Sequence, residues 1–326
     1  MESDELVPRK HYEPIDLEGI KTVPLASRKN KVHLSDFAKV GSKGLSLAAF
    51  LANLPSQLGA VDFQAVVEAI VNAHQRGKPV IWAMGAHVIK CGLSLLVIEL
   101  MKRNVITAVA MNGAGAIHDV EIALIGETSE DVAQGLADGT FGMAEETGKF
   151  INGAIAEGAR AEMGMGQIIG RKLIEVEAPH DDYSILANAF QLGTPATVHM
   201  AIGTDIVHMH PTAQGGPIGI TTFRDFRLLA AVVADLGGGG VYLNLGSAVI
   251  LPEVFLKALT VARNLGHGVS DFTAVNLDMQ QHYRPLQNVV GRPTTLGGKG
   301  YAIIGQHELM LPLLVQAIIE RLGDGK

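Results

Sequence analysis

The stretch that decides the fold runs from Pro79 to Ala116 and reads "PVIWAMGAHVIKCGLSLLVIELMKRNVITAVAMNGAGA". It opens with the short apolar run "PVIWAM", which is typical of a buried strand. The segment "HVIKCGLSLLVIELMKRN" follows with helical spacing and ends in basic residues, which suit the negative end of a helix dipole. The run "VITAVAM" then leads into the glycine-rich "NGAGA". Strand, helix and strand in this order predict a parallel βαβ unit.

The same alternation continues on both sides of this unit. The helical pattern "VDFQAVVEAIVNAHQRG" precedes it, and later helical patterns are "TTFRDFRLLAAVVADLG", "PEVFLKALTVARNLG" and "HELMLPLLVQAIIERLG". Between them lie the predicted strands "ATVHMAI", "GVYLNLG", "FTAVNLDM" and "YAIIG". The sequence therefore predicts an α/β fold, a Rossmann-like doubly wound, mostly parallel sheet with helices on both faces. Ligands of such sheets bind beyond the carboxyl ends of the strands.

The chain divides into two parts by composition. Residues 1–40 are polar and poorly periodic and contain several prolines, so we expect an N-terminal arm or extension. Residues 41–326 are expected to form a single domain. Within it, the segment from about Glu127 to Arg171 has few strand signals and many Ala, Glu and Gly residues, which predicts helices wrapped around a site.

Composition excludes several classes of protein. The net charge is −7 and no long Lys/Arg run occurs, so we expect neither a nucleic acid nor an anionic membrane as a partner. Cys91 is the only cysteine, which excludes an intrachain disulfide framework and a metal site built from several cysteines. The N-terminus "MESDELVPRK" lacks the apolar region of a signal peptide, and no apolar run reaches the roughly 20 residues of a membrane span. A cytoplasmic protein is predicted.

Two glycine-rich turns follow predicted strands. In "AVAMNGAGAIHD", Gly113 and Gly115 would let a phosphate or ribose approach the backbone closely, although the spacing is not G-x-G-x-x-G. In "YLNLGSAV", Gly246 and Ser247 end a second strand. Each turn alone is equally consistent with close packing. Together they predict a shared cofactor crevice at the carboxyl edge of the sheet, with Asp278 near a ribose.

The segment "TDIVHMHP", Thr204 to Pro211, resembles the end of a buried strand. His208 and His210 would then point to one face, so a zinc-dependent hydrolase is one interpretation, with His199 nearby. The motifs H-E-x-x-H and H-x-x-E-H are both absent. The other interpretation is a set of histidines hydrogen-bonded in a polar pocket.

Lys299 lies between glycines in "TTLGGKGYAI", ahead of a predicted strand. A lysine in such a loop is usually solvated. A functional lysine there would be a flexible amine that attacks a carbonyl or imine, and this requires a lowered pKa.

Six segments taken in order resemble deoxyhypusine synthase. They are "GAHVIKCG", "MNGAG", "GTDIVHMH", "LNLGSAV", "FTAVNLD" and "GGKGYAI" with "LMLPLLVQAI", and the resemblance extends from about Pro79 to Glu320. It implies a Rossmann-like fold, NAD bound at a subunit interface and a homotetramer. It also implies an enzyme that oxidises spermidine, holds the aminobutyl group as an imine on a lysine, and passes it to a lysine of a translation factor.

The resemblance assigns roles to individual residues. It places Lys299 on the lysine that forms the imine. Contacts with NAD are implied for two of the family's loops, at Gly85, Ala86, His87, Asn112, Gly113, Ala114 and Gly115. Gly246, Ser247 and Asp278 are expected to contact NAD because they lie at the ends of predicted strands. Contacts with substrate are implied for His118, Asp205, His208 and Glu253.

The chain departs from the family where the polyamine is bound. Paired glutamates of the family are replaced by Ile117 and His118, and a histidine pair by Pro252 and Glu253. A dication needs carboxylates to offset the cost of desolvation. We therefore expect an NAD-dependent transferase that uses another amine, with spermidine a poor substrate and a small amine or a protein lysine as acceptor. The alternatives are a metal-dependent hydrolase using His208 and His210, and a non-catalytic oligomeric protein that binds NAD.

Overall fold

The computed structural model describes residues 10–323, and they are built around one six-stranded sheet. Every neighbouring pair of strands is parallel, and the strand order is β3-β2-β1-β4-β5-β6. The strands are β1 (Val80–Met84), β2 (Ala108–Asn112), β3 (Ala196–His199), β4 (Val241–Leu245), β5 (Thr273–Asp278) and β6 (Lys299–Ile304). The predicted doubly wound, Rossmann-like sheet is confirmed.

Helices cover both faces of the sheet because strand side chains alternate between two apolar clusters. Trp82 and Met84 pack on one side, and Ile81 and Ala83 on the other. The first face is covered by α2 (Leu58–Gln75), α4 (Ser94–Lys102), α5 (Gly113–Ile125) and α13 (His307–Leu322). The second is covered by α10 (Gly215–Ala234) and α11 (Ile250–Asn264). Strands β1, β4 and β5 are buried throughout, as expected for parallel strands with two covered faces.

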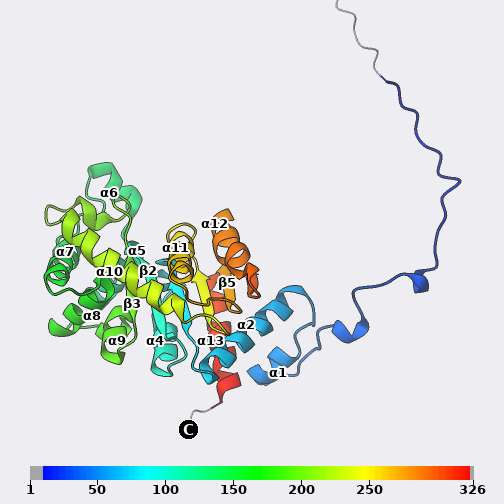
Figure 1. Cartoon of the computed structure of the whole chain (residues 1–326), viewed down its shortest axis with the longest axis horizontal. Coiled ribbons are helices and arrows are strands. Elements are labelled where there is room, and N and C mark those ends of the chain that lie inside the picture. The colour runs from blue at the N-terminus through cyan, green and yellow to red at the C-terminus, as the bar shows by residue number, and fades with distance from the viewer. Residues whose placement is uncertain (1–9, 324–326) are drawn as a thin grey trace, which may run out of the picture.

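The segment between β2 and β3 is helical, as its composition predicts. It contains α6 (Val132–Asp138), α7 (Glu145–Arg160), α8 (Met165–Glu175) and α9 (Ile185–Leu192), after the long helix α5. Figure 1 shows these helices gathered on the β3 side of the sheet. The connection from β5 to β6 is also helical, with α12 (Tyr283–Pro285) and the short turns η5 (Leu286–Gly291) and η6 (Arg292–Thr295).

Two local predictions are wrong. The segment predicted as one helix after β1 forms α3 (His87–Lys90) and α4, because Gly92 adopts a φ of +73° between them and ends the first. The "DIVHMH" segment is not a strand but the 3₁₀ helix η4 (Ile206–Met209). Strand β3 ends at His199, and Gly203 then turns the chain with a φ of +89°.

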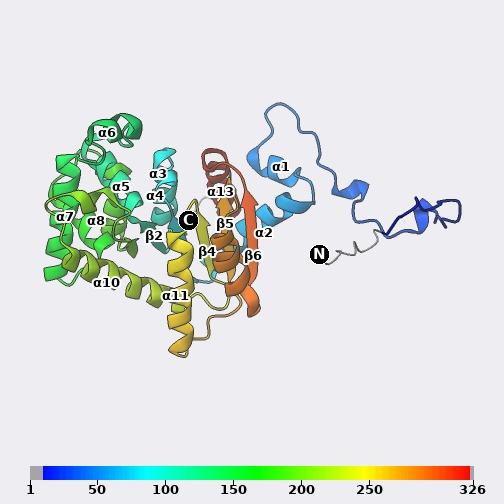
Figure 2. The same ribbon diagram turned by 90° about the horizontal axis from the view of Figure 1, so that it is seen from above.

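Residues 10–46 extend away from the body of the molecule, as both views show (Figures 1 and 2). They contain only the short turns η1 (Leu25–Ser27) and η2 (Leu34–Asp36) and are almost entirely exposed before α1 (Leu47–Ala52) begins. The first nine residues of the expected arm lie outside the described residues. No helix within residues 10–323 is both long and apolar enough to cross a membrane.

Candidate active site at the carboxyl edge of the sheet

The crevice of the sheet opens where β1 and β4 lie side by side. From β1 the chain continues towards β2, whereas from β4 it continues towards β5, so the two following segments diverge. The Gly85 N–H donates to the carbonyl of Leu245 at 3.0 Å. A Cβ added at Gly85 would lie 2.4 Å from the carbonyl oxygen of Gly246, and Gly246 itself has a φ of +65°. Both positions therefore require glycine.

The predicted cofactor residues lie along this same edge, because each follows the carboxyl end of a strand. Ala86 and His87 follow β1, Ser247 follows β4, and Asp278 ends β5. The Ser247 hydroxyl accepts from the Leu251 N–H at 3.2 Å, so this side chain supports the start of α11. The predicted meeting of the glycine turns at the carboxyl edge agrees with the parallel register of β1, β2 and β4.

The glycine turn after β2 makes room for a side chain of the protein itself. The Asn112 side chain accepts from the Gly115 N–H at 2.9 Å and caps α5. A Cβ at Gly113 would lie 2.2 Å from a carboxylate oxygen of Asp205. The space that the sequence suggested for a phosphate is therefore filled by Asp205, whose carboxylate accepts a hydrogen bond from the Ala114 N–H.

Asp205 lines a cavity of about 240 Å³ beside α5. Lys90, His118, Glu121 and Glu130 supply its other ionisable side chains. A neighbouring cavity of about 470 Å³ shares two of these glutamates and adds two more carboxylates, so acidic groups surround both spaces. The residues common to both cavities are Glu121, Ser129 and Glu130, and the added carboxylates are Glu127 and Glu146. Such a lining is suited to a ligand that carries ammonium groups.

Burial changes the protonation of two groups in this cavity. It raises the pKa of Asp205 to about 6, an effect that hydrogen bonds from Thr204 and Ala114 partly oppose. Burial, and to a smaller extent the charge of Lys90, lowers the pKa of His118 to about 4. Near neutral pH, Asp205 is therefore largely ionised and His118 is neutral.

A hydrogen-bond chain defines the tautomer of His118. The Thr128 hydroxyl donates to the Glu121 carboxylate, so the same hydroxyl oxygen accepts from the Nδ1–H of His118. The lone pair of the neutral ring is then on Nε2. An imidazole with an oriented, unprotonated nitrogen can act as a general base.

Sequence reasoning missed Lys90 and the glutamates of these cavities. Lys90 is the last residue of α3, in a segment predicted as the interior of a longer helix. The glutamates come from α5, α7 and the loop between α5 and α6. The acidic run "GETSEDV", residues 126–132, was the available signal. Ile117 and His118 replace the family's paired glutamates, and carboxylates from other segments line these two cavities.

Lys299 lies far from this cavity within one chain. It is the first residue of β6, where it pairs in register with Thr273, whereas Ile304 at the other end of β6 pairs with Asp278. Five residues of strand separate the two ends, or roughly 16 Å. Its side chain is exposed. Lys299 thus begins an edge strand and does not lie in a loop that reaches the carboxyl edge.

Glu253 is held by other side chains of the protein. It lies in the first turn of α11, where Lys257 and Arg284 form ion pairs with its carboxylate and the Asn288 amide donates to it at 2.8 Å. Lys257 is the main cause of the lowered pKa of Glu253. The structure places this residue on the α11 side of the sheet rather than in the Asp205 cavity.

The three histidines around η4 bond to separate partners. His199 Nε2 lies 3.0 Å from the Thr197 hydroxyl, His210 Nε2 contacts the Gly142 carbonyl at 2.8 Å, and His208 Nδ1 accepts from the Gly203 N–H at 3.2 Å. They do not form a group of three metal-ligating side chains; within the described residues such a group consists of His87, Cys91 and Glu308. The interpretation as histidines hydrogen-bonded in polar surroundings therefore fits better than a dinuclear hydrolase.

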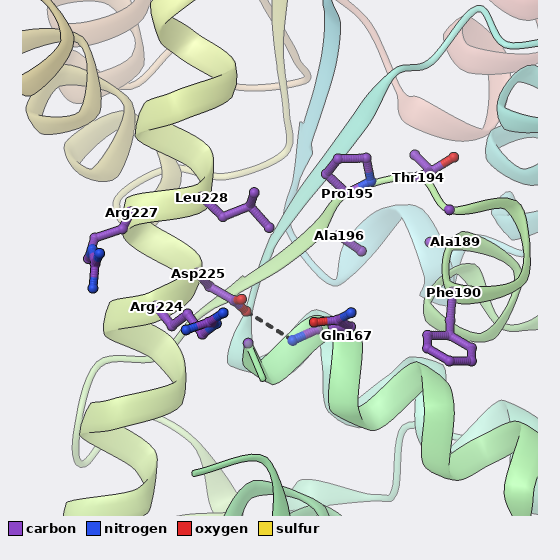
Figure 3. Close-up of a pocket in the computed structure, with 13 residues that line it drawn as sticks. Gln167, Ala189, Phe190, Thr194, Pro195, Ala196, Arg224, Asp225, Arg227 and Leu228 are labelled. Carbon is purple, nitrogen blue, oxygen red and sulfur yellow. Dashed lines mark hydrogen bonds between the residues drawn. The ribbon is translucent and has the colours of Figure 1, made fainter. Parts of the chain in front are cut away.

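Another cavity, of about 520 Å³, lies at the other end of β3 and is shown in Figure 3. Asp225 reaches into its wall from α10 and accepts from the Gly166 N–H at 2.9 Å and the Val198 N–H at 2.7 Å. Burial raises the pKa of Asp225 to about 7. Since Asp225 connects α10 to the start of α8 and to β3, its contacts have a structural explanation, and we place the candidate site at the Asp205 cavity.

Comparisons with known proteins give a fold rather than a family. No protein-family model matches the chain, and no curated protein was found to be a significant relative. Solved structures do match. A LOR/SDH protein from Methanococcus maripaludis S2 is 16% identical with a TM-score of 0.51, over 82% of this chain and 71% of its own. A protein assigned as a deoxyhypusine synthase from Entamoeba histolytica is 12% identical with a TM-score of 0.51, over 84% and 93%.

A third match is AgrE in a ternary complex with ornithine and NAD⁺. It is 16% identical with a TM-score of 0.51 over 81% of this chain, which spans only 33% of AgrE. The chain has a deoxyhypusine synthase-like fold. The fold resemblance that the sequence motifs imply is confirmed, and the same fold occurs in LOR/SDH proteins.

Proposed function

We propose that this protein is an NAD-dependent transferase that oxidises an amine and transfers the alkylamine group through a lysine imine. The observation that carries the proposal is the carboxylate-lined cavity around Asp205, next to the crevice between β1 and β4. Two proteins of the same fold also point to amines: one is assigned as a deoxyhypusine synthase, and the other binds ornithine, a diamino acid, together with NAD⁺.

NAD would lie along the edge where the segments after β1 and β4 diverge. Glycines at 85 and 246 allow the two strand ends to pack directly against each other and against His307. Asp278 at the end of β5 can accept hydrogen bonds from ribose hydroxyls. The start of α5 would border the nicotinamide ring. The residues there are Asn112, Gly113, Ala114 and Gly115. When bound, NAD would supply the acceptor for a hydride from the amine-bearing carbon.

The side chains of the cavity then have distinct tasks. Asp205 and Glu130 would bind the ammonium groups of the substrate. His118 Nε2 would take the proton from the amine nitrogen as a hydride leaves the neighbouring carbon, which gives a C=N bond. A lysine amine would add to that carbon, the original C–N bond would break, and the released amine would leave with a proton. An acceptor amine would then attack the lysine imine, the lysine amine would leave as its C–N bond breaks, and return of the hydride to the new C=N bond would give the alkylamine product.

Two lysines compete for the covalent role. Lys90 lines the cavity within the same chain. Lys299 is the residue that the resemblance implies. It would have to reach the site from another subunit, since it begins β6 at the amino ends of the strands. Both lysines remain candidates, because the resembling family binds NAD between subunits, where Lys299 of a second chain would approach the site.

A homotetramer would bring a second chain to the site. The helix α10 exposes Ile220 and Phe223, which are three residues apart and therefore neighbours on one face of the helix. Burial of such residues between subunits would remove apolar area from water. Light scattering at micromolar concentration gives the assembly size, and a monomer would contradict this part of the proposal.

Trapping with borohydride tests the reaction. The protein is incubated with NAD and a panel of diamines, triamines and diamino acids, and reduced cofactor and labelled protein are followed. Lys90→Arg and Lys299→Arg keep the charge but cannot form the imine. We expect one variant to lose the label while the other keeps it. Failure of every amine to reduce NAD, together with no NAD binding by calorimetry, would refute the proposal.

A carboxylate variant tests the amine site separately. Asp205→Asn keeps the size of the side chain but removes the charge that would bind an ammonium group. We expect KM for the amine to rise by about 10-fold or more, as for a lost charged hydrogen bond of roughly 1.5–3 kcal/mol. Glu253→Gln is the matched control outside the cavity and should leave KM unchanged. Equal effects of the two variants would refute the assignment of the cavity.

A further inference from the structure

Three side chains of metal-binding type meet beside the crevice, where α3 contacts α13. His87 is the first residue of α3, Cys91 caps its end, and Glu308 lies in the first turn of α13. The Cys91 Sγ lies 3.3 Å from His87 Nε2 and 3.9 Å from Glu308 Oε2. One ligand atom from each residue lies within 4.8 Å of the other two. Within the described residues no other group of this kind occurs.

The distances match those between ligands of one metal ion. With metal–sulfur bonds of about 2.3 Å and metal–nitrogen or metal–oxygen bonds of about 2.0–2.2 Å, tetrahedral geometry separates two ligand atoms by about 3.5 Å. The two distances from Cys91 Sγ lie on either side of this value. His87 and Cys91 are four residues apart on one helical turn, so the backbone of α3 already holds both on the same side.

A second histidine, His307, packs against His87 but lies outside the group of three ligand atoms. The His307 ring contacts the His87 ring edge-on, with 5.4 Å between centroids. His307 is only 1% exposed, and its Nε2 contacts the Leu277 carbonyl at 3.2 Å, so Nε2 carries the proton. The Nδ1 atom then holds a lone pair, and it is buried without a hydrogen-bond partner. A buried acceptor without a donor is costly unless a ligand satisfies it.

The alternative of a catalytic cysteine fits less well. A nucleophilic thiolate needs a neighbouring positive charge and a base that is oriented by a third group. Here the third group, Glu308, contacts the cysteine itself rather than the histidine. An anionic carboxylate beside a thiol is better suited to a shared cation.

We propose that His87, Cys91 and Glu308 bind one divalent metal ion of the zinc class, with a fourth position left for water or substrate. Imidazole, thiolate and carboxylate together favour zinc over magnesium or calcium. Binding displaces the thiol proton, which passes to solvent, so affinity rises with pH. The site adjoins the crevice, and three protein ligands with an open fourth position are typical of catalytic zinc.

The inference does not depend on the proposed amine chemistry, because its readout is metal binding. It gives His87 the role of metal ligand in place of the cofactor contact implied by the resemblance. The remaining residues of the crevice keep their assignments. Binding of metal without NAD, or of NAD without metal, would therefore separate the two proposals.

Titration with cobalt tests the site in the full chain. Protein freed of metal by a chelator is titrated with Co²⁺ alone, and the thiolate-to-cobalt charge-transfer absorbance is recorded. Because Cys91 is the only cysteine, this absorbance identifies it as a ligand. We expect one equivalent of Co²⁺ to bind and Zn²⁺ to displace it. Absence of the band at one equivalent or more would overturn the proposal.

Variants distinguish a site with three protein ligands from metal binding by the Cys91 thiol without the other two side chains. His87→Gln and Glu308→Gln keep the cysteine, and each should weaken binding by about 10-fold or more. His267→Gln is the control, since His267 is exposed after α11 at the opposite edge of the sheet, and it should bind as the parent does. Unchanged affinity in both ligand variants, with Trp82 fluorescence showing native folding, would refute the site.

Discussion

Replacement of Gly85 by alanine should destabilise the protein by forcing β1 and β4 apart. The added Cβ would lie 2.4 Å from the Gly246 carbonyl oxygen and 3.2 Å from its carbonyl carbon. Both atoms are backbone, so no side chain can rotate away. Relief requires the strand ends to separate, although the Gly85 N–H donates to the Leu245 carbonyl at 3.0 Å and holds them together.

The magnitude follows from two opposing effects. Overpacking of a filled interior costs about 1–3 kcal/mol. The lower conformational entropy of alanine in the unfolded chain offsets about 0.4–1 kcal/mol of this. We therefore expect the free energy of unfolding to fall by roughly 1–2 kcal/mol. The proposed cofactor crevice would widen at the same time, so NAD affinity should fall with it.

Trp82 makes the measurement direct. It is the only tryptophan, it is buried within β1, and it lies three residues before Gly85. Guanidinium unfolding followed by its fluorescence reports the free energy of unfolding. The control is Gly153→Ala in α7, where no atom lies within 4 Å of the added Cβ, and this variant should be more stable by about 0.5–1 kcal/mol. If the two variants have equal stability, the close approach of the strand ends is not a constraint.

Two further substitutions test buried polar groups. Asp225→Asn should change how stability depends on pH: burial raises the pKa of the native carboxyl to about 7 from 3.8, so its contribution is complete below about pH 4 and is lost as pH rises through 7. The variant should lack this decline, which amounts to at most about 1.4 kcal/mol per pH unit, and a difference between parent and variant that does not vary with pH would contradict it. Asn112→Ala should lower the free energy of unfolding by about 0.5–2 kcal/mol, because the Gly115 N–H loses its acceptor. Urea unfolding measures this loss, and an unchanged midpoint would contradict the role of the cap.

The sheet could be predicted because its signals are local and repeated. Each buried strand is a short apolar run, and each crossover helix carries its own apolar periodicity and terminal residues. Parallel pairing follows, since a helix between two strands of one sheet requires a crossover connection. The positions of Gly85 and Gly246 at the carboxyl edge then follow from chain direction alone.

The site could be predicted only in part because its groups come together through tertiary packing. A single glycine at 92 ends α3 and places Lys90 at the helix end, where it reaches the cavity. Glu130 comes from a loop whose acidic residues look like a solvated surface in sequence. Lys299 was predicted as part of the site but does not lie there within one chain. Its flanking glycines suggest a mobile loop, whereas its backbone belongs to the edge strand β6.

Three buried aspartates explain why the helix N-termini of this fold are poor places to look for a cofactor phosphate. Asp119 accepts from the Ser184 hydroxyl and from two N–H groups at the start of α9, and Asp225 accepts from N–H groups at the start of α8 and in β3. Asp205 occupies the start of α5 in the same way. Each aspartate satisfies a helix terminus that would otherwise attract an anion.

Asp205 differs from the other two in how few donors it has. Its carboxylate receives one backbone N–H, from Ala114, and a long contact of 3.5 Å from the Thr204 hydroxyl. Asp119 receives three donors, and Asp225 receives two on one oxygen while its other oxygen has no partner. The remaining lone pairs of Asp205 face a cavity that also contains Glu121 and Glu130. A carboxylate that is buried, ionised and incompletely bonded is stabilised most by a cation. Asp205 therefore excludes a phosphate from the N-terminus of α5 and also favours an ammonium group in the adjoining cavity.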